Sequence, residues 1–197
     1  MQNPSSPRIL LASESRYRQG LLDRFLDDYE TIAPAIDESA REGEQPQQLV
    51  TRLARAKAEA VSRTNPDALI IGADQIAVLG GAVLGKPGDH QKAVEQLLAA
   101  SGKKMRFLTA VCVLDPVSRR RYEHIDKTRV RFRRFDRRLA DAYLRHDEPY
   151  DCAGSFRLGG AGFVLFESVN TDDPTALIGL PMIWLAGTLQ ELGCLLP

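Results

Sequence analysis

The sequence is poor in cysteine and contains no long hydrophobic run. Its 197 residues include three cysteines, at positions 112, 152 and 194, which form no CxxC pair and leave one thiol over in any disulfide scheme. This usage is typical of a reducing compartment, so we expect a cytoplasmic protein. No apolar stretch reaches the length of a membrane span, and residues 1–7 lack the basic and apolar regions of a secretion signal. We therefore expect no membrane partner, and a flexible segment at residues 1–7.

Charge of one sign is not in excess. The 26 lysines and arginines balance the 26 aspartates and glutamates, so no overall field attracts the chain to nucleic acid or to an anionic surface. The basic residues at 129–133 alternate with apolar ones, as in a strand with one solvated face, and we expect no nucleic-acid partner there. Any anion site must be local.

Several familiar motifs are also absent. The glycine-rich residues 159–162 precede an apolar strand pattern, whereas a dinucleotide-binding motif opens a helix. Gly-Lys-Lys at residues 102–104 lacks the upstream glycine and the following serine or threonine of a P-loop. The three histidines lie outside any metal-ligand spacing. The commonest nucleotide and zinc signatures are therefore excluded.

The order of the expected elements indicates one mixed α/β domain over residues 8–197. Strand signals and helical periodicities alternate, with short hairpins between some of the strands. This order favours an α/β or α+β domain with a mixed sheet. The expected strands cover residues 8–13, 29–36, 68–79, 82–84, 105–114, 122–135 and 163–169, and the expected helices cover residues 17–26, 46–63, 89–100, 137–146 and 181–192.

A lysine interrupts the apolar stripe of the expected helix over residues 46–63. Leu53 and Val61 share this stripe with Lys57, so the lysine points toward the core. Burying an unpaired ammonium is costly, and Lys57 needs either an anion or a route by which its stem reaches water. Both alternatives stay open on the sequence alone.

Two polar residues, Asp74 and Gln75, interrupt a strand that is otherwise apolar on both faces. Strands disfavour aspartate, and a carboxylate at such a place must be paired, metal-bound or protonated. The alternative is a bulge or strand end at which Asp74 accepts backbone hydrogen bonds. Asp74 is the strongest functional signal in the sequence.

Two loops add complementary charge. Asp37 and Glu38 follow the expected second strand as adjacent carboxylates, which suit a divalent cation but are also ordinary turn residues. Lys86 precedes a proline, which holds it in an extended conformation and allows its ammonium to be aimed.

The first expected strand ends in Ser-Glu-Ser at residues 13–15, directly before a helix. Hydroxyls, free backbone N–H groups and the positive helix end meet there, and Arg16 and Arg18 add charge. The alternative is a plain serine N-cap with solvated arginines. Together with the two lysines and the carboxylates, this pattern describes a polyphosphate held with a metal ion.

Five ordered motifs resemble the Maf family of nucleoside triphosphate pyrophosphatases. They are Leu-Ala-Ser-Glu-Ser-Arg-Tyr-Arg (11–18), Ile-Asp-Glu (36–38), Ala-Lys-Ala (56–58), Ile-Gly-Ala-Asp-Gln (71–75) and Gly-Lys-Pro (85–87). The similarity continues through Cys-Ala-Gly-Ser-Phe (152–156) and Gly-Leu-Pro (179–181). It is greatest to the branch acting on 7-methyl-GTP, which carries Gln rather than Thr after the aspartate.

This resemblance implies a fold, a reaction and a cofactor. The implied fold is akin to that of the inosine triphosphatase-like enzymes, an elongated mixed sheet flanked by helices with a cleft between two lobes. Such proteins are commonly homodimers. In the reaction, water attacks the α-phosphorus of a nucleoside triphosphate and releases the monophosphate and pyrophosphate. Such a reaction would remove unwanted nucleotides from the cellular pool. The implied cofactor is a divalent cation, Mg²⁺ or Mn²⁺.

The resemblance also implies roles for individual residues. Asp74 would accept the proton of the attacking water and share the metal with Glu38. These roles agree with the chemistry, since cations neutralise phosphate charge while carboxylates hold the metal and orient water. The positions that match substrate-binding residues of the family are Ser13, Arg18, Glu38, Lys57 and Lys86.

Three positions are associated with the choice of base. Tyr17 stands where tryptophan is more typical of the branch, and Gln75 fits it. Gly159 occupies the place of an expected acid, which would pair with a guanine edge or a methylated, cationic ring. The missing acid leaves another modified triphosphate or a pyrimidine triphosphate open as the substrate.

Two other functions also stay open. One is a nucleotide-binding regulator that restrains septum formation without turnover, although binding alone does not require Asp74. The other is a metal-dependent phosphatase that removes the terminal phosphate.

Overall fold

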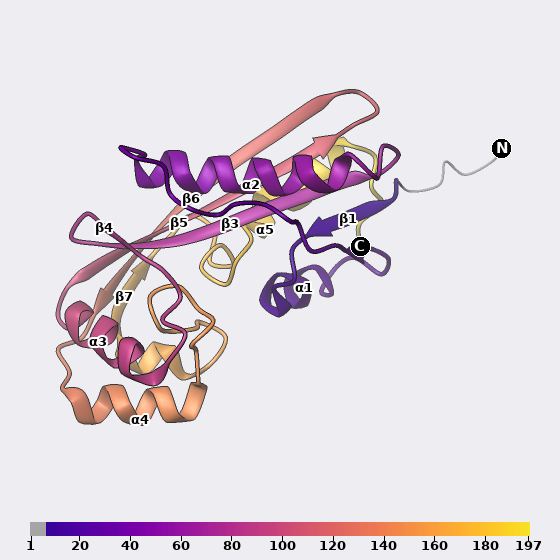
Figure 1. The fold of residues 1–197 in the computed structure, drawn as a ribbon. Coiled ribbons are helices and arrows are strands. Elements are labelled where there is room, and N and C mark those ends of the chain that lie inside the picture. Colours follow the sequence, from indigo (N-terminus) through magenta and orange to yellow (C-terminus); the bar gives the residue numbers. More distant parts are fainter. Residues whose placement is uncertain (1–6) are drawn as a thin grey trace. The chain divides into compact units, whose positions relative to one another are not determined.

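The computed structural model describes residues 7–197, which form a mixed α/β fold (Figure 1). The expected flexible segment, residues 1–7, lies outside the described residues except for Pro7. The strands are β1 Ile9–Ala12, β2 Glu30–Thr31, β3 Leu69–Leu79, β4 Ala82–Leu84, β5 Lys104–Asp115, β6 Arg120–Phe132 and β7 Phe166–Asn170. The helices are α1 Arg16–Leu22, α2 Pro46–Ser62, α3 His90–Ala100, α4 Arg137–Asp147 and α5 Met182–Glu191, with a 3₁₀ helix η1 at Ala161–Leu165.

The strands form one mixed sheet, as the sequence predicts. Their order is β2-β1-β3-β5-β6-β7, and β4 pairs with β3 as the return strand of a hairpin. Strand β1 runs parallel to both β2 and β3, whereas β4 is antiparallel to β3 and β7 is antiparallel to β6. The register places Ala12 opposite Gly72, which brings the end of β1 close to the polar interruption of β3.

Two expected strands are shorter than the sequence indicates. The strand predicted over residues 29–36 comprises only β2, because Pro34 offers no N–H to a neighbouring strand. The strand predicted over residues 163–169 begins at Phe166, since the chain first turns through η1. A Cβ added at Gly162 of η1 would lie 2.5 Å from the Arg157 carbonyl oxygen, so only glycine fits at this point of the turn.

The chain divides into two compact units. The first comprises the described part of Met1–Asp74 together with Thr109–Ile125 and Gly179–Pro197, and the second comprises Gln75–Leu108 and Asp126–Ile178. The single domain expected over residues 8–197 stays a prediction.

In the first unit, α2 packs on the sheet with very little space between backbones. The helix begins at a proline, and the Gln45 N–H donates to the Gln48 side chain in a capping box. A Cβ added at Gly72 of β3 would meet the Ala58 nitrogen at 2.7 Å and would also clash with the Ala54 carbonyl. Glycine at this position therefore lets α2 approach β3 closely at the turns on either side of Lys57.

Replacing this glycine tests the close approach. We expect Gly72→Ala to lower the free energy of unfolding by about 3 kcal/mol, because a backbone carbonyl cannot move aside as a flexible side chain can. Gly187→Ala in α5 is the matched control, since its Cβ meets nothing within 4 Å and helical alanine gains about 0.5–1 kcal/mol over glycine. Denaturant melts of both variants measure the difference, and equal stability of the two would contradict the packing.

The second unit has its own aromatic core. Helices α3 and α4 lie side by side against it (Figure 1). Phe156 packs edge-to-face against Phe107, Phe132 and Phe166, with ring centroids 4.7–5.7 Å apart. The last residue of the Cys-Ala-Gly-Ser-Phe motif is thus a core residue of this unit.

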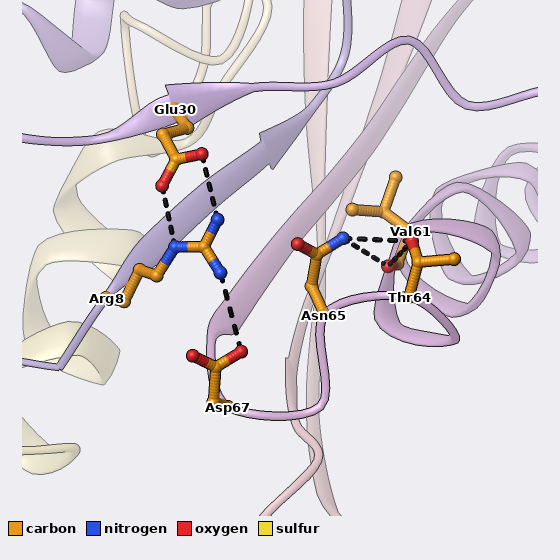
Figure 2. Close-up of polar contacts among 6 residues, drawn as sticks. All are labelled: Arg8, Glu30, Val61, Thr64, Asn65 and Asp67. Carbon is orange, nitrogen blue, oxygen red and sulfur yellow. Dashed lines mark hydrogen bonds and ion pairs between the residues drawn. The ribbon is translucent and has the colours of Figure 1, made fainter.

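Polar contacts fix both ends of the connection that leads from α2 into β3 (Figure 2). The Asn65 amide donates to the Val61 carbonyl at 3.0 Å and so satisfies the end of α2. Arg8, next to β1, pairs with Glu30 at 2.6 Å and with Asp67 at 3.4 Å. These pairs are exposed and contribute little stability, but they tie β1, β2 and the start of β3 together.

Among residues 7–197, no helix combines the length and the apolar character needed to cross a membrane. The three cysteines are all free thiols, and burial raises the pKa of Cys112 to about 12.

Candidate active site

A buried lysine joins two carboxylates in the first unit. The Lys57 ammonium lies 2.6 Å from Oδ1 of Asp74 and 2.9 Å from Oε1 of Glu38. Lys57 and Asp74 are only 6 % and 7 % exposed, whereas the Glu38 side chain is 58 % exposed. The anion that Lys57 requires is therefore the protein's own, and Asp74 is a paired carboxylate within the continuous strand β3.

The loop that carries Glu38 is held by an arginine that the sequence did not single out. Arg52 of α2 donates to the Glu44 carboxylate at 2.6 and 2.8 Å and to the Ser39 carbonyl at 2.9 Å. Its hydrogen bonds lower the pKa of Glu44 to about 2. Asp37 accepts from the Ser39 N–H at 2.9 Å, so it is the ordinary turn residue and Glu38 is the one directed to the lysine.

Ser13 and Arg18 are also placed together. The Arg18 guanidinium donates to Oγ of Ser13 and to the carbonyl of Gly179, both at 3.1 Å. The Ser15 N–H donates to the same hydroxyl oxygen at 3.1 Å, so the Ser13 hydroxyl retains its own hydrogen to donate. Burial lowers the pKa of Arg18 while the charges of Asp74 and Glu38 raise it, and the guanidinium stays protonated at neutral pH.

The residues expected to choose the base have well-defined surroundings. The Arg16 guanidinium lies 4.9 Å from the centre of the Tyr17 ring and donates to its hydroxyl at 2.9 Å. The Gln75 amide donates to the Ala176 carbonyl at 2.8 Å. The planar guanidinium of Arg16 therefore lies over the Tyr17 ring. The NH₂ group of Gln75 is already hydrogen-bonded to a backbone carbonyl.

Two predicted site residues, Lys86 and Gly159, lie with Gln75 in the second unit. Lys86 is exposed, and its ammonium makes no ion pair within the described residues. Gly159 is exposed as well, and a Cβ built there meets nothing within 4 Å. The other predicted site residues all lie in the first unit: Ser13, Tyr17, Arg18, Glu38, Lys57 and Asp74. The parts that all of these residues play in a site stay predictions.

No group of three or more histidine, cysteine, aspartate or glutamate side chains within residues 7–197 is arranged to hold a metal ion. Glu38 and Asp74 do provide two hard oxygen donors that converge on one point, now shared with Lys57. Mg²⁺ is commonly bound by one or two carboxylates together with substrate phosphates, so this pair fits a metal that arrives with a polyphosphate.

A hollow of about 420 Å³ on the first unit does not contain the predicted residues. It is lined by Tyr122, Glu123, Ile183, Trp184, Gly187, Thr188 and Glu191. The functional signals of the sequence therefore point to the charge cluster rather than to this hollow.

Comparison with known proteins decides the family. The family model described as Maf-like protein matches residues 8–192. The chain belongs to the Maf family. The resemblance predicted from the ordered motifs is confirmed by this match, which spans all of them.

Curated relatives of this Maf chain share nearly its whole length. A 7-methyl-GTP pyrophosphatase of Nitrosococcus oceani is 43 % identical over 193 residues, which cover 98 % of this chain and 97 % of the relative. The protein of the same name from Xanthomonas axonopodis is 46 % identical and covered completely, with 97 % of this chain aligned. One from Alkalilimnicola ehrlichii is 47 % identical over 95 % of this chain and 94 % of its own. These relatives therefore carry the name of the branch that the sequence motifs predict, the one acting on 7-methyl-GTP.

Proposed function

We propose that this Maf protein is a metal-dependent pyrophosphatase that hydrolyses 7-methyl-GTP to 7-methyl-GMP and pyrophosphate. The observation that carries the proposal is the buried Asp74–Lys57 pair with Glu38, in a chain aligned over its length with relatives named for this reaction. A buried carboxylate next to a fixed ammonium is costly to retain, and catalysis accounts for its presence.

Asp74 is the proposed proton acceptor. Its Oδ1 is bonded to Lys57, and its Oδ2 makes no hydrogen bond within the described residues, which leaves that oxygen for a water molecule. The oxygen of the water forms a bond to the α-phosphorus while the bond from phosphorus to the bridging oxygen breaks. Pyrophosphate leaves, and the proton of the water passes to Asp74.

Glu38 and Asp74 are the residues that would hold Mg²⁺ or Mn²⁺. When bound, the ion neutralises phosphate charge and helps to fix the orientation of the triphosphate. Lys57 keeps the two carboxylates converged before any ligand arrives, because its ammonium contacts both.

Three further residues are proposed to bind the phosphates. Ser13 has a hydroxyl hydrogen to donate, and Arg18 is held rigidly by Ser13 and Gly179. Lys86 is proposed from its match to the family motif and from its exposed ammonium, which makes no ion pair with residues 7–197. Tyr17, Gln75 and Gly159 are proposed as the positions that select the base.

We further propose a cytoplasmic homodimer whose role is to remove a modified nucleotide from the pool. Its partner is the nucleotide substrate, without a nucleic-acid or membrane partner. These proposals rest on the balanced charge, the cysteine usage and the resemblance to the family.

The missing acid at Gly159 gives a direct test of base choice. Gly159→Glu should be accommodated, because a Cβ there has open space. We expect the ratio of kcat/KM for 7-methyl-GTP to that for GTP to rise about five- to tenfold, since a carboxylate favours the cationic ring. Gly159→Gln, of similar size but uncharged, is the control. Equal ratios for the two variants would show that the charge plays no part.

Product-resolved hydrolysis tests the proposed reaction. The panel contains 7-methyl-GTP, GTP, UTP, dTTP and CTP, each with Mg²⁺, with Mn²⁺ and with a chelator. We expect pyrophosphate to be released fastest from 7-methyl-GTP and not at all in the chelator. Orthophosphate as the product would establish the phosphatase alternative. Binding without turnover across the panel would support the alternative of a nucleotide-binding regulator. Faster pyrophosphate release from another nucleotide would reject 7-methyl-GTP as the preferred substrate.

A further inference from the structure

One glutamine of α3 joins two of the family motifs that lie far apart in the sequence. The Gln96 Nε2 donates to the carbonyl of Gly85 at 3.2 Å, and its Oε1 accepts from the Ser155 hydroxyl at 2.6 Å. Gly85 begins the Gly-Lys-Pro motif that contains Lys86, and Ser155 belongs to Cys-Ala-Gly-Ser-Phe. All of these residues lie in the second unit.

The chemistry of the two partners fixes the orientation of the amide. A backbone carbonyl only accepts, so the Nε2 end of Gln96 must face Gly85. The Oε1 end must then face Ser155, whose hydroxyl donates to it. Both ends of one side chain are therefore used, and neither aspartate nor glutamate, which only accept when ionised, reproduces this pair of bonds.

A second anchor lies on the other side of Lys86. The Gly88 N–H donates to the carbonyl of Tyr150 at 3.0 Å. The hydroxyl of Tyr150 lies 3.0 Å from Nδ1 of His90 at the start of α3. Lys86 and the buried Pro87 are thus held between two attachments, both of which lead to the segment of residues 150–155.

The end of that segment is buried and closely packed. Ser155 is fully buried and has a positive φ of 63°, next to Gly154 with a φ of 77°. A Cβ at Gly154 would lie 3.0 Å from the Met105 sulfur and 3.1 Å from the Phe107 ring, so the backbone there is pressed onto the core. Strain in a non-glycine residue persists only where the surroundings fix it, and Phe156 supplies that fixation from within the aromatic core.

We propose that Gln96 is a positioning residue that holds the Lys86 ammonium in place for the phosphates of the substrate. The inference rests on the proposed function, in which Lys86 binds those phosphates. Lys86 is exposed and has no ion-pair partner within the described residues, so its placement depends on the backbone that carries it. Gln96 supplies that control from one side, and it couples Lys86 to the motif characteristic of the branch.

Steady-state kinetics with 7-methyl-GTP and Mg²⁺ test the positioning role. We expect Gln96→Leu to lower kcat/KM about ten- to a hundredfold, because a small displacement of a charged group costs that much. Gln96→Glu should lower kcat/KM to a similar extent. Its side chain is nearly isosteric with glutamine, but its carboxylate repels the Gly85 carbonyl. Gln91→Leu is the matched control: Gln91 is on the same helix, but its bonds go to Glu95 and Arg137, and activity should be unchanged.

A double-mutant cycle separates positioning from general damage to the fold. In a Lys86→Ala background we expect Gln96→Leu to lower kcat/KM by less than about twofold, because the group that it positions is gone. A purely structural role of Gln96 would instead give the same loss with and without Lys86, and that result would overturn the inference. Wild-type activity of Gln96→Leu would overturn it as well.

Hydrogen exchange gives a readout that does not depend on turnover. We expect faster amide exchange in Gln96→Leu over both residues 85–88 and residues 150–155, with α4 unchanged. If the wild type fails to hydrolyse 7-methyl-GTP while both segments loosen, the proposed function is wrong but the coupling of the two motifs stands. If neither segment changes, the coupling is wrong whatever the substrate.

Discussion

Asp74→Asn is expected to reduce kcat for 7-methyl-GTP by about a thousandfold, within the range contributed by a positioned general base. Asparagine keeps the shape of the side chain and can accept a hydrogen bond from Lys57, which lies 2.6 Å from Oδ1 in the wild type. It cannot take the proton of the attacking water. Rapid-quench kinetics measure the loss, and equilibrium binding of 7-methyl-GTP with Ca²⁺ in place of Mg²⁺ should change only a few fold.

Asp37→Asn is the matched control for this prediction. Asp37 lies in the loop that carries Glu38, but its carboxylate accepts from the Ser39 N–H, a role that asparagine also fills. We expect this variant to retain most of its activity. Turnover of Asp74→Asn at the wild-type rate would reject Asp74 as the proton acceptor, whatever the effect on binding.

Lys57→Met is expected to lower the free energy of unfolding by about 3–5 kcal/mol and to abolish turnover. The variant leaves the Asp74 carboxylate, which is 7 % exposed, without its ammonium, and an unpaired buried charge is strongly destabilising. Activity falls because the two carboxylates repel each other once the shared cation is removed. Urea unfolding curves and the hydrolysis assay measure the two effects separately.

The control for Lys57 is Arg55, which lies on the same helix but forms a partly exposed ion pair with a residue of β6. Arg55 pairs with Glu123 at 2.8 Å, but both side chains are partly exposed, so Arg55→Met should cost less than about 1 kcal/mol. A second check is the double variant Lys57→Met with Asp74→Asn, which we expect to be more stable than Lys57→Met alone. A loss of stability no greater than that of Arg55→Met would contradict the burial of the Lys57 charge.

Most of the fold is predictable from periodicity and from the residues that end each element. The apolar stripe and the proline of α2 fix its start at the predicted residue, and α3 and α4 follow the aspartates that cap them. The two exceptions have different causes, and the first is Pro34, which has no N–H to donate to a neighbouring strand and so keeps β2 short. In the second, apolar residues such as Phe163, which is 64 % exposed, indicate a strand, whereas the chain makes a 3₁₀ turn in which Gly162 lies close to the Arg157 carbonyl.

The candidate site is only partly predictable. Lys57 and Asp74 stand out because each breaks an apolar pattern, but their pairing depends on the register between α2 and β3, which the close approach at Gly72 sets. Arg52 and Gln96 were missed by sequence analysis. Each lies at a partly exposed helical position where a polar residue is common, and each donates to a loop carbonyl that sequence spacing does not predict.

Hydrolysis in ¹⁸O-labelled water tests most directly which phosphorus of the triphosphate is attacked. Wild-type protein, 7-methyl-GTP and Mg²⁺ are incubated to a single turnover, and both products are analysed by mass spectrometry. We expect the label to appear entirely in 7-methyl-GMP, because water attacks the α-phosphorus and pyrophosphate leaves with its original oxygens. Label in pyrophosphate, or in released orthophosphate, would place the attack on another phosphorus and contradict the proposed pyrophosphatase.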